Sequence, residues 1–393
     1  MEFGFTAEEE AFRQEVRRFL EKELPLEHDL AVINPAEDRY RDGVWELQKA
    51  MARKFGKKGW LTLGWPKEYG GREGSPLLGA IFQEEIHYRG TPGWDGFTVG
   101  MLAPTIIRFG TEEQKKQHLL PIARGERFWC EGFSEPETGS DLASIQTSAR
   151  EDGDSLVING RKLWTSGAHK ADWCFLLVRT DPAPPKKHMG ITFLLLDMQT
   201  PGITVRVITD MGGGDNLCEV FFDEVRVPLE NILGQKDQGW EVAMTLLDFE
   251  RGLDIGPIAT MRRIFEMLLQ YLKEEGKGTN PLVRQQLAEI ELEIETARLL
   301  SYRGAWLANQ KIPASAQISM SKTFSYEAQQ RAANVAMKLL GSYGQLSEGS
   351  KWAALQGLIE RWYLETFAFT LFTGTSEIQR NIIATRGLGL PRG

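Results

Sequence analysis

The residues best suited to chemistry lie in a polar, turn-rich stretch, WCEGFSEPETGSDLASIQTSA (129–149). We expect this stretch to form a loop directly after a strand, presenting the hydroxyl groups of Ser134, Thr138 and Ser140 beside several backbone N–H groups. Donors grouped in this way suit the edge of a planar heteroaromatic ring or a phosphate-bearing chain. On composition alone, a solvated hairpin loop explains the same residues, so both interpretations stay open.

A second candidate segment, RKLWTSGAHKADW (161–173), places an aromatic ring and hydroxyl groups where a strand is expected to end. Its chemically useful residues are Trp164, Thr165 and Ser166. Taken alone, Trp164 is typical of a core side chain, since large aromatic residues are highly buried on average.

The sequence lacks the motifs of several common enzyme and nucleotide-binding families. GxxxxGK[ST], HExxH and GxSxG do not occur, and MGGGDN (211–216) is not GxGxxG and lies between strand-like runs. A dinucleotide on a Rossmann fold is therefore not expected. The histidines show no metal-ligand spacing, and the three cysteines (Cys130, Cys174 and Cys218) lie far apart without CxxC, which argues against a zinc site or a disulfide framework.

The secondary structure expected around these segments changes twice along the chain, from helix to strand and back to helix. Residues 5–125 show helical patterns, with capping-box signatures at Thr6 with Glu9 and at Thr111 with Gln114. From about 127 to 233 the runs are short and rich in Val, Ile, Phe and Thr, as strands are. These runs are 156–164, 173–180, 191–197, 203–208 and 218–227. No helical patterns alternate with them, so we expect an antiparallel barrel or sandwich.

Helical patterns return after about residue 236. An amphipathic helix is predicted around 283–297 and a second from Ala314 to Leu340, and a last helix over 375–386 opens with Ser376 and Gln379 at capping-box spacing. The predicted fold is mainly α with a central antiparallel β domain. Its domains are expected at 1–126 (helical), 127–234 (β) and 235–393 (helical bundle).

Overall composition limits the partners of this 393-residue chain. Its 46 basic and 54 acidic side chains give a net charge of −8, which disfavours nucleic acid and anionic membranes as partners. No apolar run approaches the roughly 18–20 residues that a membrane-spanning helix needs, and the acidic start does not resemble a signal peptide. We therefore expect a reduced, cytoplasmic protein.

Three motifs, taken together, resemble one family. FSEPETGSD (133–141), GRKLWTSGAHKAD (160–172) and GTSEIQRNIIATRGLGLP (374–391) resemble acyl-CoA dehydrogenases in order and separation, over essentially the whole chain. The helix–β–helix order matches the three-domain fold of that family. The resemblance implies FAD as the redox cofactor, an acyl-CoA thioester as substrate, a tetramer, and a place in fatty acid or acyl-CoA degradation.

The resemblance also implies roles around the flavin ring. Phe133 and Ser134 match donors to the pyrimidine edge of the flavin, Trp164 matches the aromatic residue against the isoalloxazine, and Ser166 matches the hydroxyl near flavin N5.

Outside the ring, three further residues match family positions. Ser140 matches a contact to FAD phosphate or to the CoA arm. Thr375 and Glu377 match the start of the final helix, which approaches the FAD, and a helix N-terminus favours phosphate-rich ligands.

The implied reaction is α,β-dehydrogenation, in which a carboxylate removes the α-proton of the thioester. The commonest position of that base is occupied here by Thr373, which cannot accept the proton, although its backbone N–H can still bind the thioester carbonyl. Some members carry the base in a motif resembling LLDFERG (246–252), where Glu250 matches the base and Arg251 an arginine near the CoA chain. A Glu250–Arg251 ion pair without a catalytic role is the alternative.

Two departures concern cofactor binding and assembly. The Arg-x-Gln-Phe-Gly element that reaches a neighbouring subunit's FAD has no counterpart in YLKEEGKGTNPLVRQQLAE (271–289), where Lys277 is a loose substitute. Lys338 and Ser342 replace the Gln and second Gly often found in that family. This pattern resembles subunits of heteromeric acyl-CoA dehydrogenases that act on bulky acyl groups.

The resemblance is compatible with more than one assembly, electron acceptor and activity. It implies a homotetramer or a heterotetramer with a paralogous subunit, and an electron-transfer flavoprotein as partner. The base on the Glu250 helix favours a bulky, branched, cyclic or long-chain acyl group. An acyl-CoA oxidase, and a silent subunit that completes a partner's FAD site, are the alternative functions.

Overall fold

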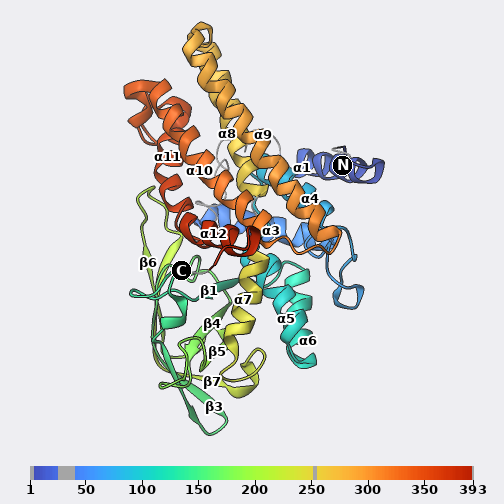
Figure 1. The fold of residues 1–393 in the computed structure, drawn as a ribbon, viewed down its shortest axis with the longest axis vertical. Coiled ribbons are helices and arrows are strands. Elements are labelled where there is room, and N and C mark those ends of the chain that lie inside the picture. Colours follow the sequence, from blue (N-terminus) through green and yellow to red (C-terminus); the bar gives the residue numbers. More distant parts are fainter. Residues whose placement is uncertain (1–3, 25–39, 251–254, 392–393) are drawn as a thin grey trace.

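A computed structural model describes residues 4–24, 40–250 and 255–391. Helices form the two ends of the chain and a curled seven-stranded sheet lies between them, so the predicted fold class is confirmed. Figure 1 shows the sheet at one end of the molecule and the long C-terminal helices projecting from the other. In the described ranges, no helix is long and apolar enough to cross a membrane.

The N-terminal part contains five described α-helices, and both predicted capping boxes in it are confirmed. The Thr6 and Thr111 hydroxyls accept the N–H groups of Glu9 and Gln114, whose side chains accept the cap N–H groups in return. The helices are α1 (Ala7–Glu23), α3 (Asp42–Lys58), α4 (Pro76–Tyr88), α5 (Ala103–Phe109) and α6 (Glu112–Ala123), with a π-helical turn at Gly96–Leu102.

The strands follow in the order β1-β4-β2-β3-β7-β6 across the sheet, and β5 pairs with β4. Their bounds are β1 (Trp129–Gly132), β2 (Ser148–Asp152), β3 (Ser155–Lys162), β4 (Trp173–Arg179), β5 (Ile191–Asp197), β6 (Ile203–Ile208) and β7 (Leu217–Pro228). Antiparallel pairing dominates, through β2–β3, β3–β7, β4–β5 and β6–β7.

The sequence prediction missed β2, and it assigned the residues of β1 to the polar loop, which was expected to follow a strand. β1 pairs in parallel with β4, and the four residues of β1 have no repeat long enough to reveal a strand. β2, with the sequence SARED, exposes all but one of its side chains and so shows no clear alternation. It is a strand because the turn at Gly153 folds it back onto β3.

The C-terminal helices pack into a bundle above the sheet (Figure 1). The bundle consists of α8 (Ile255–Glu274), α9 (Pro281–Asn309), α10 (Ser315–Leu340), α11 (Leu358–Phe369) and α12 (Ser376–Ile382), which a π-helical turn extends over Ile383–Gly387. The helix before them, α7 (Gly239–Glu250), lies beside the sheet, against β5. The buried residues Leu287, Ile290, Ile294 and Ala297 of α9 confirm the amphipathic pattern.

The predicted cap of the last helix was wrong by one residue. Thr375 is the N-cap, since its hydroxyl accepts the N–H of Ile378 at 3.2 Å. The Ser376 side chain instead points into the interior, where Oγ is buried without a hydrogen-bond partner among the described residues.

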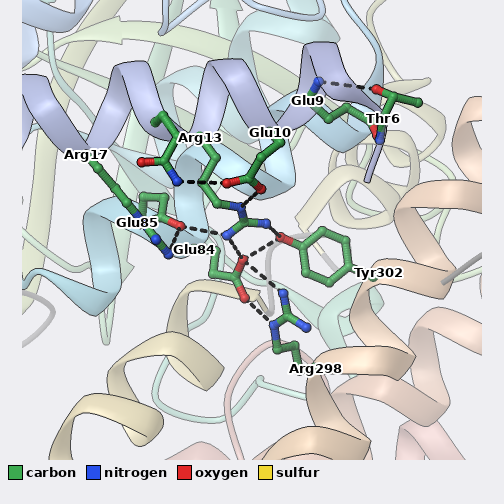
Figure 2. A network of polar contacts seen from close by, with 10 residues as sticks. Thr6, Glu9, Glu10, Arg13, Arg17, Glu84, Glu85, Arg298 and Tyr302 are labelled. Carbon is green, nitrogen blue, oxygen red and sulfur yellow. Dashed lines mark hydrogen bonds and ion pairs between the residues drawn. The ribbon is translucent and has the colours of Figure 1, made fainter. Parts of the chain in front are cut away.

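A buried charged network joins α1, α4 and α9 (Figure 2). Arg13 Nη1 lies 2.7 Å from Glu84 and 2.6 Å from Glu85. Glu84 also pairs with Arg298 at 2.5 Å and accepts the Tyr302 hydroxyl at 2.6 Å. Because each buried carboxylate has several donors, the network fixes the first helix and the long C-terminal hairpin to the same element.

Candidate active site

The structure brings the two candidate segments together. The Leu163 N–H donates to the Ser134 carbonyl at 2.9 Å, so Ser134 lies beside the residue that precedes Trp164. Phe133 is buried, and its ring packs edge-on against Phe175. The end of β1 and the end of β3 therefore form one continuous edge, with Ser134 and Trp164 as neighbours.

A buried ion pair fastens this junction. Lys162 is fully buried, and Nζ donates to Glu135 Oε1 at 2.8 Å and to the Phe133 carbonyl at 3.0 Å. Burial lowers the pKa of Lys162 to about 8, while the Glu135 charge opposes that change. Burial also disfavours ionised Glu135, but Lys162 and the hydrogen bonds to the carboxylate hold its pKa below the ordinary value. Both groups are therefore charged at neutral pH.

Glu135 also shapes the polar loop that follows. Its carboxylate accepts the N–H groups of Gln146 at 2.7 Å and Thr147 at 2.9 Å, which closes the loop onto its own start. Arg179 holds the far side by donating to the Ala143 carbonyl at 2.7 Å. Ser140 is exposed near the tip of this closed loop.

Trp164 is exposed and strained. Its side chain is 54% exposed, and its φ of +64° lies in the left-handed region, which non-glycine residues rarely adopt. The following N–H groups hold it there: Thr165 donates to the Cys218 carbonyl at 2.9 Å and Gly167 to the Asn216 carbonyl at 2.7 Å. The ring is thus exposed rather than buried in the core, contrary to the expectation for an isolated Trp, and the half-buried Ser166 lies two residues further on.

A second group of matched residues lies at the turn between α11 and α12. Thr373 has a φ of +55°, Thr375 caps α12, and Glu377 is in its first turn. The pKa of Glu377 is lowered by its own backbone N–H and by the Thr375 hydroxyl. Within the described part of the chain, no hydrogen bond or ion pair joins this turn to Ser134, Trp164 or Ser166.

The predicted base lies at the limit of the described residues. Glu250 is the last residue of α7, which packs against β5, α5 and the π-helical turn Gly96–Leu102. Its side chain, and Arg251 altogether, lie outside the described residues.

The predicted weak point of FAD binding lies at the tip of the α8–α9 hairpin. A pocket there is lined by Leu272, Gly276, Lys277, Thr279, Asn280, Val283 and Leu339. Lys277 is the single basic side chain among these lining residues, so it alone could offer charge to a phosphate.

Sequence reasoning missed the residues that hold the site together. Lys162, Glu135 and Arg179 were not singled out, although all of them lie in or beside the quoted motifs. The one available signal was a lysine within a strand whose neighbours alternate toward the core, because a charged group in such a position needs a partner.

Comparison with known proteins identifies the class to which this fold and site belong. Residues 6–126, 130–225 and 237–388 match the N-terminal, middle and C-terminal domains of acyl-CoA dehydrogenases. The chain therefore belongs to the acyl-CoA dehydrogenase family, whose members are FAD-dependent oxidoreductases.

Within this family, the chain is similar to several individual members over its whole length. The chain is 35% identical to the acyl-CoA dehydrogenase IpdE1 of Mycobacterium tuberculosis, over 98% of both chains. It is 34% identical to the acyl-CoA dehydrogenase FadE26 of the same organism, over 100% of this chain and 99% of the relative. Among solved structures, the Tcur3481-Tcur3483 steroid ACAD matches with a TM-score of 0.90 at 32% identity, over 100% of both chains.

The residues present fit the flavin ring. An exposed indole on a strained backbone, a hydroxyl at Ser166 and the adjacent Ser134 offer a stacking face and polar groups on one edge. The buried hydroxyls of Thr138 and Thr165 also have no hydrogen-bond partner among the described residues, which leaves donors beside this edge.

Proposed function

We propose that this chain performs FAD-dependent α,β-dehydrogenation of an acyl-CoA thioester, with Glu250 as the base that removes the α-proton. The observation that carries the proposal is the exposed Trp164 on its left-handed backbone, adjacent to Ser134, in a chain with all three family domains. Bound FAD supplies the acceptor for the β-hydride.

The remaining roles belong to residues of this chain. Ser134 and Ser166 hold the polar edge of the flavin, Trp164 covers its face, and Phe133 contributes backbone contacts. Ser140 binds FAD phosphate or the CoA arm from the loop tip. These assignments are supported by the closed loop and the shared strand edge.

Two further residues, Glu250 and Thr373, remove the α-proton and polarise the thioester carbonyl. Glu250 accepts the α-proton, because Thr373 has no carboxylate, and the Thr373 N–H binds the thioester oxygen as negative charge develops there. Arg251 holds the CoA chain, and Thr375 and Glu377 approach the FAD from the start of α12.

Glu250→Gln tests this assignment. Gln keeps the shape but cannot accept the proton, so flavin reduction by substrate should slow by about 10²–10⁴-fold while FAD stays bound. Stopped-flow flavin bleaching by a set of acyl-CoA thioesters gives the measurement and also identifies the substrate. Asp248→Asn is the matched control, and bleaching at a near wild-type rate in Glu250→Gln would move the base elsewhere.

We further propose that the acyl group is bulky, branched, cyclic or long, and that the chain works in acyl-CoA degradation in the cytoplasm. The similarity to a structure named for a steroid ACAD supports the bulky class. An electron-transfer flavoprotein is the proposed acceptor. Reoxidation of the reduced enzyme by O₂ at the turnover rate would favour the acyl-CoA oxidase instead.

The pocket at the hairpin tip supports a proposal about assembly. Since Lys277 is its single basic lining residue, we propose that a paralogous subunit completes the FAD site, as the heteromeric structures among the relatives suggest. Flavin per protomer and native mass of the chain purified alone test this. One tightly held FAD per protomer in a homotetramer would contradict it, whereas a chain that never bleaches with any partner would be a silent subunit.

A further inference from the structure

Two buried side chains hold three consecutive carbonyl groups of the turn before α12. Lys322 Nζ donates to the Phe372 carbonyl at 2.9 Å and to the Gly374 carbonyl at 2.6 Å. Gln379 Nε2 donates to the Thr373 carbonyl at 3.0 Å and to the Gly374 carbonyl at 3.3 Å. Lys322 comes from the first half of α10, about 50 residues earlier in the chain.

These donors lie in the interior, where a charge is costly. Lys322 is 2% exposed and Gln379 is fully buried. Ordinary capping of a short helix does not need an ammonium group, since the Thr375 hydroxyl already caps α12. The buried charge therefore does more than end a helix.

Lys322 and Gln379, here called the clamp, fix the direction of the backbone N–H groups in the turn before α12. Thr373 and Gly374 have φ values of +55° and +81°, and the first is a strained conformation for a β-branched residue. The described peptide bonds are all trans, so each N–H points away from the carbonyl of the same peptide group. Carbonyls held inward thus turn the N–H groups outward, and the Thr373 N–H has no acceptor among the described residues.

The peptide group between Phe372 and Thr373 couples the two sides. Its carbonyl accepts the Lys322 ammonium, and its N–H belongs to Thr373. A charged donor on the carbonyl polarises the amide and strengthens its N–H as a donor, because hydrogen bonds in a chain polarise one another.

We infer that Lys322, assisted by Gln379, is a positioning residue that orients and polarises the Thr373 N–H toward the thioester carbonyl of the substrate. This inference rests on the proposed function. It supplies a reason for a buried lysine that belongs to none of the three motifs, and it gives the strained turn at Thr373 a role in stabilising developing enolate charge.

Lys322→Met tests the clamp with a side chain of similar length and no donor. Thr323→Val is the matched control, since it removes a buried hydrogen bond of the next residue, to Ser319 within α10, without touching the turn. Both variants are prepared as the flavin-loaded enzyme, together with the partner subunit where flavin loading requires it.

The spectroscopic readout is the absorption band of enzyme-bound 3-(2-furyl)acryloyl-CoA, which moves to longer wavelength when its thioester carbonyl is polarised. We expect the wild type and Thr323→Val to shift this band and Lys322→Met to lose most of the shift. Losing one oxyanion donor outright costs roughly 10²–10³-fold in kcat, so a displaced donor should cost about 10–100-fold, with KM changed much less. Lys322→Arg should restore part of both signals.

A folded Lys322→Met enzyme with the full band shift and wild-type kcat would overturn the inference, as would a wild-type enzyme that is bleached by substrate but never shifts the band. If Lys322→Met does not fold, Gln379→Met decides, and an unchanged shift there overturns the clamp. If no thioester bleaches the wild-type flavin, the proposed function fails instead. A crystal structure of Lys322→Met then tests the geometry alone, and a retained left-handed Thr373 refutes it.

Discussion

Replacing Lys162 with methionine should open the junction between β1 and β3. The change removes the partner of a buried carboxylate, and breaking a buried pair in this way costs about 3–5 kcal/mol. The Glu135 carboxylate would still accept hydrogen bonds from the N–H groups of Gln146 and Thr147. These bonds stabilise its charge in part, so we expect a loss of stability near the lower of these two values. Glu135→Gln should cost less, because burial lowers the pKa of Lys162 and Glu135 raises it; without Glu135, the lysine can lose its proton near neutral pH instead of staying buried as an unpaired charge.

Hydrogen exchange measured by mass spectrometry on peptides from β3 reports this opening locally. A loss of 3–5 kcal/mol corresponds to exchange that is faster by roughly 10² to several 10³-fold. Arg161→Met is the matched control on the same strand, since Arg161 is exposed and its pairing with Glu219 at 3.5 Å should contribute no more than about 1 kcal/mol. The double variant Lys162→Met/Glu135→Gln should recover part of the loss. Exchange within a few-fold of wild type in Lys162→Met would refute this account of the junction.

Two further predictions follow from the same physics. Thr375→Ala should lose about 1 kcal/mol of local stability in α12, whereas Ser376→Ala should lose less, and hydrogen exchange over 376–383 compares them; equal losses would contradict Thr375 as the cap. Burial opposes ionisation of Glu84, but hydrogen bonds from Arg298, Tyr302 and Arg13 hold its pKa below the ordinary 4.5, so its stabilising contribution is present above that pH and is lost as the pH falls. The melting temperature of the wild type should then fall more steeply than that of Glu84→Gln below about pH 4.5, and parallel curves would exclude this role.

The sequence by itself determined the local elements and the family. The capping boxes at Thr6 and Thr111 need only residues three positions apart, so they were readable without tertiary information. Helical spacing over 283–297 and the strand runs at 191–197 and 203–208 likewise depend on near neighbours. The three motifs were continuous stretches, and they sufficed to indicate the family and its cofactor.

Tertiary structure alone decided how those stretches work together. β1 is a strand because β4 offers it a parallel partner more than 40 residues away. Ser134 lies beside Trp164 because its carbonyl accepts the N–H of Leu163, which is also distant in sequence. Lysine is usually exposed, but Lys162 and Lys322 are both buried. Each can be buried because groups distant in the sequence accept its hydrogen bonds. Such contacts carry no periodicity along the chain. They are set by which elements pack together, and only the folded chain brings those elements together.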